Sequence, residues 1–88
     1  MSELRVIVGF ETGLHARPAA AFVRRVATCG LPVTIAKEGR EPVDAASILQ
    51  VLTLGANKGD EVILRSAGED ADEVLAQLAA MLSDTSIT

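Results

Sequence analysis

The sequence predicts an α+β fold with a four-stranded antiparallel sheet and three helices packed on one face of it. The first indication is the order in which strand and helix periodicities alternate along the chain, which reads β-α-β-β-α-β-α. A second is that the predicted strands are strongly apolar on one face only, as expected for a sheet covered on one side. The third is composition: 49% of residues are hydrophobic but only two are aromatic, so the core must be aliphatic. A length of 88 residues predicts one domain spanning residues 1–88.

The N-terminal half predicts a strand, a helix and a hairpin. Apolar residues alternate over residues 4–10, which is typical of a strand with one buried face. Pro18 suits the first turn of the next helix, and Gly30 suits its end. The strand within residues 31–37 turns at Gly39 and meets a short partner near residues 41–44, where Pro42 indicates a sheet edge. The helix is predicted from an apolar stripe with helical spacing, formed by Ala19, Phe22, Val23 and Val26.

The C-terminal half predicts a short helix, a strand and a long helix. Ser47 before the segment ILQVLTL, and Gly55 after it, are capping residues for a short helix. The segment DEVILRS predicts the last strand, and residues 83–88 are expected to form a frayed tail. The long helix before that tail is predicted from the apolar residues Ala71, Val74, Leu75, Leu78 and Leu82.

Charge and cysteine content exclude several classes of protein. The net charge of −4 argues against a general nucleic-acid-binding protein, which needs a basic surface. A single cysteine, Cys29, can form neither an intramolecular disulfide nor a cysteine zinc cluster, and this fits a reducing compartment. No apolar run is long enough for a membrane span, and the N-terminus does not resemble a signal peptide. We therefore expect a cytoplasmic protein without membrane insertion, metal or cofactor.

The only histidine of the chain, His15, lies just before the first predicted helix. Residue 16 is alanine, so no side-chain oxygen caps the first N–H groups of that helix, and these groups can bind an anion. The region of Ala16, Arg17 and Pro18 is therefore the predicted phosphate-binding site, where Arg17 adds a guanidinium. The positive potential favours a neutral imidazole with a nitrogen lone pair that can act as a nucleophile. The alternative is a histidine that is merely solvated or hydrogen-bonded at a turn.

Two segments of the chain resemble the signature segments of HPr, the histidine-containing phosphocarrier family of the bacterial sugar phosphotransferase system. The segment TGLHARPAA, residues 12–20, resembles the active-site segment, and residues 47–62 resemble the second signature segment. The element order and the length resemble an HPr from end to end. The resemblance implies an open-faced β-sandwich, with a four-stranded antiparallel sheet and three helices on one side.

The resemblance also implies a function for the histidine. His15 would accept a phosphoryl group on Nδ1 from phospho-enzyme I, at the expense of phosphoenolpyruvate, and pass it to the IIA domains of sugar permeases. Arg17 would stabilise the phosphorylated state. Such a protein is a stoichiometric carrier rather than an enzyme, and a monomer is expected because it must present one face to successive partners.

Ser47 has two interpretations. As the N-cap of the short helix it would stabilise the fold by about 1 kcal/mol. In many HPr proteins the matching serine is a regulatory phosphorylation site, which would imply a serine kinase and phosphatase as further partners. Ala46 precedes the serine where many members of the family have lysine, which weakens the regulatory interpretation.

Two predicted surfaces complete the partner-binding site. The short helix has more apolar residues than one buried face can take, and the resemblance suggests that Val51 and Leu54 point inward while the others form a docking patch. The polar side of the first helix carries a predicted basic rim, favoured especially at Arg17 and Arg24, for which an ordinary solvated face is the alternative. The residues on this side are Arg17, Ala20, Ala21, Arg24 and Arg25. The docking patch consists of Ile48, Leu49 and Leu52.

Three functions remain in competition at this point. The first is a phosphohistidine carrier of the sugar phosphotransferase system. The second is a regulatory binding module that docks through the same patch without carrying phosphate, although His15 and Arg17 are both present. The third is a paralogue that serves a nitrogen-related phosphotransferase branch with the same chemistry.

Overall fold

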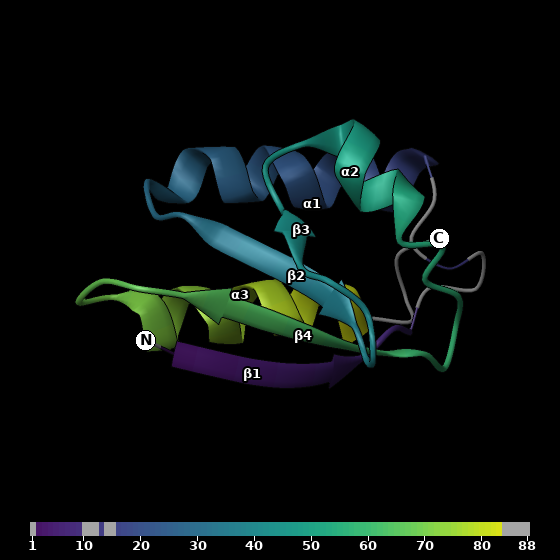
Figure 1. Cartoon of the computed structure of the whole chain (residues 1–88). Coiled ribbons are helices and arrows are strands. Elements are labelled where there is room, and N and C mark those ends of the chain that lie inside the picture. Colours follow the sequence, from purple (N-terminus) through teal and green to yellow (C-terminus); the bar gives the residue numbers. More distant parts are fainter. Residues whose placement is uncertain (1, 10–12, 14–15, 84–88) are drawn as a thin grey trace.

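The fold is a single antiparallel sheet with helices on one face, as Figure 1 shows. A computed structural model describes residues 2–9, 13 and 16–83. Within these residues the order of elements is the one predicted. The strands and helices, in chain order, are β1 (Ser2–Ile7), α1 (Ala16–Cys29), β2 (Val33–Lys37), β3 (Val43–Asp44), α2 (Ile48–Thr53), β4 (Glu61–Ser66) and α3 (Ala71–Ser83).

The strands lie in the order β1-β4-β2-β3, and every neighbouring pair is antiparallel. The short strand β3 is therefore an edge strand, as Pro42 predicted. In register, Leu64 of β4 pairs with Leu4 of β1 and with Ile35 of β2, and this row of side chains points toward the helices. One residue along, Ile63 pairs with Arg5 and with Ala36, and that row lies on the face without helices, called here the open face.

The core fills the layer between the sheet and the helices. Phe22 of α1, Ile35 of β2 and Leu64 of β4 are all fully buried. The predicted stripes of both long helices face this layer, since Ala19, Val26 and the leucines of α3 are buried with them. Among the described residues the core is aliphatic apart from Phe22, as the composition predicted.

The boundaries of several elements differ from the prediction. The strand predicted over residues 4–10 spans Ser2–Ile7 as β1, because the backbone of Val8 bonds to the loop before β4 rather than to a strand. Phe10 lies outside the described residues. The helix α3 includes Ser83, so the predicted tail is shorter at that end, and residues 84–88 lie outside the described residues.

Candidate functional site

The candidate site lies where α1 begins, at the end of the molecule where α2 ends (Figure 1). Helix α1 begins at Ala16, one residue after His15, so Ala16 belongs to the first turn rather than to the capping position. Pro18 also lies in the first turn, as predicted. Because Pro18 has no N–H, the backbone donors of this turn include those of Ala16 and Arg17. His15 itself lies outside the described residues.

The predicted rim residues of α1 lie on one exposed line. Arg17, Ala20 and Arg24 are all exposed, and their spacing places them on the same side of the helix. Arg25 does not belong to this line: its Nη2 donates to Oε1 of Gln77 in α3 at 2.5 Å. The sequence placed Arg25 with the others because spacing along one helix cannot show which neighbouring helix offers an acceptor. The basic rim is therefore Arg17 and Arg24.

Helix α2 lies beside α1 in the helix layer and carries the docking patch. Leu49 is 74% exposed and Leu52 is 37% exposed. Ile48, the third predicted member, is half-buried and packs partly against the core, so it forms the border of the patch. The inward pair is confirmed, because Val51 and Leu54 are both buried.

Ser47 is the N-cap of α2, which confirms the structural interpretation of this residue. Its backbone is extended, and its Oγ accepts a hydrogen bond from the backbone N–H of Gln50 at 3.4 Å. Two further bonds fix the segment before the helix. The Asp44 N–H donates to Oε1 of Gln50 at 2.9 Å, and the Ala46 N–H donates to Oδ1 of Asp44 at 2.9 Å. The start of α2 is thus tied to the edge strand β3.

A contact between the two signature segments was not predicted. Gly13 is buried and has a φ of +73°, a conformation that favours glycine. A Cβ atom on Gly13 would lie 2.6 Å from the carbonyl oxygen of Ala56 and 2.8 Å from the Cα of Asn57. The backbone of residue 13 therefore rests directly on the loop that joins α2 to β4. The glycine in TGLH was a visible signal, but the sequence did not show what it packs against.

The loop under Gly13 contains a carboxylate with a shifted pKa. The backbone N–H of Asn57 donates to Oδ2 of Asp60, and this bond lowers the pKa of Asp60 below its ordinary value of 3.8, with a further contribution from Lys37. A lowered pKa means that the ionised group stabilises the native state above about pH 3.8. That contribution is lost as the pH falls through the lowered pKa.

The described part of the chain holds no group of three or more His, Cys, Asp or Glu side chains that could bind a metal ion. Within the same residues, no helix combines the length and the apolar character that a membrane span requires. At the start of α1 the described residues supply backbone N–H groups and the guanidinium of Arg17.

Comparisons with known proteins agree with this geometry. A family model described as "PTS HPr component phosphorylation site" matches residues 2–84. The phosphocarrier protein HPr of Streptomyces coelicolor is 51% identical over 84 residues, which cover 96% of this chain and 90% of that protein.

Solved structures give the same result. The crystal structure of a phosphocarrier protein HPr from Bacillus anthracis aligns with a TM-score of 0.86 and 36% identity, covering 92% of this chain and 95% of that one. A crystal structure of Crh, the catabolite repression protein of Bacillus subtilis, is described as a dimer with a swapped domain. It aligns with a TM-score of 0.71 and 40% identity, covering 93% of each chain. The chain therefore belongs to the HPr family, the phosphocarrier proteins of the phosphotransferase system.

Proposed function

We propose that this protein carries a phosphoryl group on Nδ1 of His15, accepting it from phospho-enzyme I and passing it to the IIA domains of sugar permeases. The observation that carries the proposal is the start of α1 at Ala16, the residue that follows His15 in the sequence TGLHARPA. The first N–H groups of a helix have no partner within the helix, so they can bind an anion. The protein would act in the cytoplasm as a monomer, consumed and regenerated in each cycle rather than turning over a substrate.

The chemistry of the transfer needs little beyond these groups. The Nδ1 lone pair of a neutral His15 forms a bond to phosphorus, while the bond between phosphorus and the donor group of enzyme I breaks and its electrons stay with that donor. The proton on Nε2 remains on the ring. Phosphoryl transfer depends mostly on positioning and on charge stabilisation. The helix N–H groups and the exposed guanidinium of Arg17 supply the stabilisation on the product side.

The surface around the site is suited to two partners that bind one after the other. The docking patch offers exposed apolar area on α2, and the basic rim offers Arg17 and Arg24 on α1 beside it. An apolar patch bordered by positive charge is complementary to an acidic partner with an apolar centre, and the charges increase the rate of encounter. Enzyme I and the IIA domains would use the same face at different times.

A second candidate function is that of a regulatory module. Crh, to which this chain is similar, is described as a catabolite repression protein, so family membership alone is compatible with both functions. His15 and Arg17 favour the carrier, because a module that only docks needs neither a nucleophile nor an anion-stabilising guanidinium. Ser47 would serve regulation if a kinase phosphorylated it. Its hydroxyl already caps α2 and borders the docking patch, so a phosphate there would add negative charge to the partner surface.

The test is a phosphorus NMR spectrum of the protein after incubation with phosphoenolpyruvate, magnesium and enzyme I. We expect an acid-labile phosphoimidazole signal that is absent in His15→Ala and present in Ser47→Ala. In a parallel incubation with ATP and a serine kinase, an acid-stable signal that disappears only in Ser47→Ala would support the regulatory function instead. If the wild-type protein takes up no phosphoryl group at all, the carrier proposal is wrong.

A further inference from the structure

The loop of residues 56–60, called here the platform loop, contacts the chain at Gly13, two residues before His15 in the sequence. It joins α2 to β4 at the end of the molecule where α1 begins (Figure 1). The backbone of Gly13 lies against Ala56 and Asn57 so closely that even one added methyl group would collide with both. Ala56 is fully buried beneath this contact, so the loop cannot yield inward without disturbing the core.

The platform loop is also hydrogen-bonded to the chain just after β1, at Val8. The Val8 N–H donates to the carbonyl of Asp60 at 2.9 Å, and the Gly59 N–H donates to the carbonyl of Val8 at 2.9 Å. The chain therefore leaves β1 at a point bonded to the platform loop, and it meets the loop again at Gly13 before α1 begins. Val8 and Gly13 therefore both contact the same short loop.

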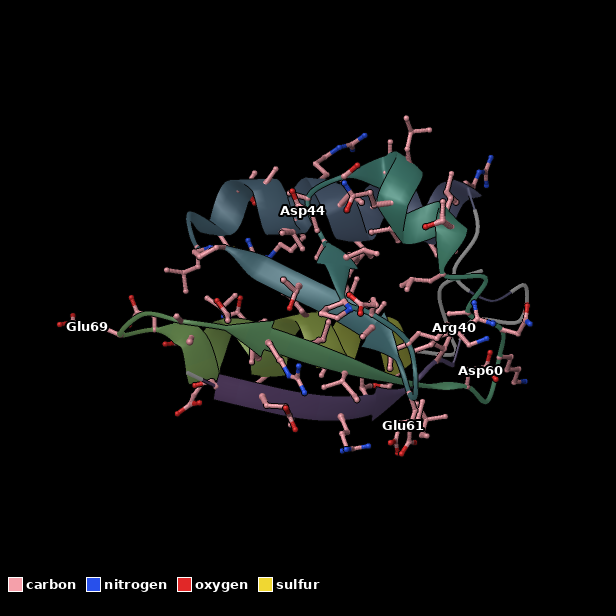
Figure 2. The ribbon with its side chains drawn as sticks, viewed as in Figure 1. Arg40, Asp44, Asp60, Glu61 and Glu69 are labelled. Carbon is pink, nitrogen blue, oxygen red and sulfur yellow. The ribbon has the colours of Figure 1, made fainter. Side chains whose placement is uncertain are left out.

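The shape of the platform loop depends on the side chain of Asp60. Its Oδ2 accepts the N–H of Asn57 at 2.9 Å, while its own N–H donates to the carbonyl of Asn57 at 2.9 Å. These two bonds close the loop from both sides. The Nζ of Lys37 lies 3.4 Å from the same Oδ2, which connects the loop to the end of β2. Figure 2 shows Asp60 at this end of the molecule and Glu69 at the opposite end.

We propose that Asp60 is a positioning residue for phosphoryl transfer: by accepting the Asn57 N–H it holds the platform loop, and through Gly13 the loop places the segment that carries His15. The inference rests on the proposed function, because it concerns the transfer to His15. Asp60 itself touches no reacting atom. Its effect is expected on the rate of transfer, since small misplacements of reacting groups are costly.

The first experiment measures single-turnover transfer from phospho-enzyme I by rapid quench. Asp60→Ala, which removes the acceptor, is expected to slow the transfer step about tenfold without weakening the binding of enzyme I. Asp60→Asn keeps an oxygen acceptor for Asn57 but removes the charge, and it should transfer at nearly the wild-type rate. Lys37→Met should also transfer at nearly the wild-type rate, because it removes only the ion pair with Asp60. Glu69→Ala is the control for loss of a negative charge far from the loop.

The outcomes separate positioning from charge and from stability. Wild-type transfer in Asp60→Ala would overturn the proposal, and so would an Asp60→Asn variant as slow as Asp60→Ala, because charge would then be the cause. Gly13→Ala alters the same contact by adding a methyl group at Gly13 instead of changing the loop. Its transfer step should be as slow as that of Asp60→Ala. If Asp60→Ala does not fold, Gly13→Ala and Asp60→Asn still decide the question.

A second readout does not depend on transfer. The protein has one histidine, so it has a single imidazole Hε1 resonance, whose titration reports the surroundings of the ring. Asp60→Ala should move the midpoint of this titration, and Asp60→Asn should restore it. If the wild-type protein accepts no phosphoryl group, the proposed function fails, but the titration still tests the positioning. Identical titrations in all variants would contradict it.

Discussion

Among the described residues, helix α2 and the open face of the sheet differ in how far they expose most of their apolar side chains. On α2, the side chains of Leu49 and Leu52 are exposed to solvent. No ion pair found between described residues crosses these two side chains. On the open face of the sheet, Ile63 is only 9% exposed although no helix covers it. Ile7, at the end of β1, is the exception on the open face at 50% exposed, so this face is closed around Ile63 and not over its whole area.

The open face is closed by ion pairs that run across the strands. Arg5 of β1 donates to Glu61 of β4 at 2.7 Å and lies 3.5 Å from Glu38, and this bonding raises its pKa further above the ordinary value. Arg65 donates to Glu3 at 2.7 Å. Long side chains fixed in this way lay their methylene groups over apolar neighbours while the charges stay in water. Isolated pairs of this kind add little stability.

The largest expected effect is a loss of affinity for enzyme I. It is measured by replacing one exposed apolar residue on each of the two surfaces. Leu49→Gln should weaken the binding of enzyme I by about 1–2 kcal/mol, roughly tenfold, because Leu49 is the most exposed residue of the docking patch. Ile7→Gln is the matched control, since Ile7 is 50% exposed on the open face. It should leave affinity unchanged. Calorimetric titration measures both, and equal losses in the two variants would remove the distinction between the surfaces.

A smaller effect, on the rate of association with enzyme I, is expected when Arg24 of the basic rim is replaced. Arg65 on the open face provides the comparison. Arg24→Gln should lower the association rate with enzyme I a few-fold at low salt, and the difference should shrink as salt screens the charge. Arg65→Gln makes the same charge change on the open face, where the arginine is already paired with Glu3. Stopped-flow association at several salt concentrations compares them. Equal salt dependence would mean that net charge, and not the basic rim, governs encounter.

The sequence predicted the elements well because each depends on local patterns. The edge position of β3 followed from Pro42, and the N-cap of α2 followed from Ser47 with the apolar run after it. The inward pair Val51 and Leu54 was correct as well, although it came from the resemblance to HPr and not from periodicity.

The parts that could not be predicted depend on contacts between distant segments. Nothing in the pattern of α1 shows that Arg25 bonds to Gln77 of α3, which takes it out of the basic rim. Gly13 and Asn57 are 44 positions apart, and only the fold brings them together. The burial of Ile63 is of the same kind, because its cross-strand neighbours, Arg5 of β1 and Ala36 of β2, come from other parts of the chain. His15 and its role stay a prediction, because this residue lies outside the described residues.

The most direct test of the two-surface account is a titration of the isotope-labelled protein with enzyme I, followed by amide NMR. We expect shifted or broadened amide resonances at the start of α1 and along α2, centred on Arg17, Arg24 and Leu49. The resonances of Arg5, Ile63 and Arg65 on the open face should stay in place. Changes centred on the open face, with α2 unaffected, would contradict the account.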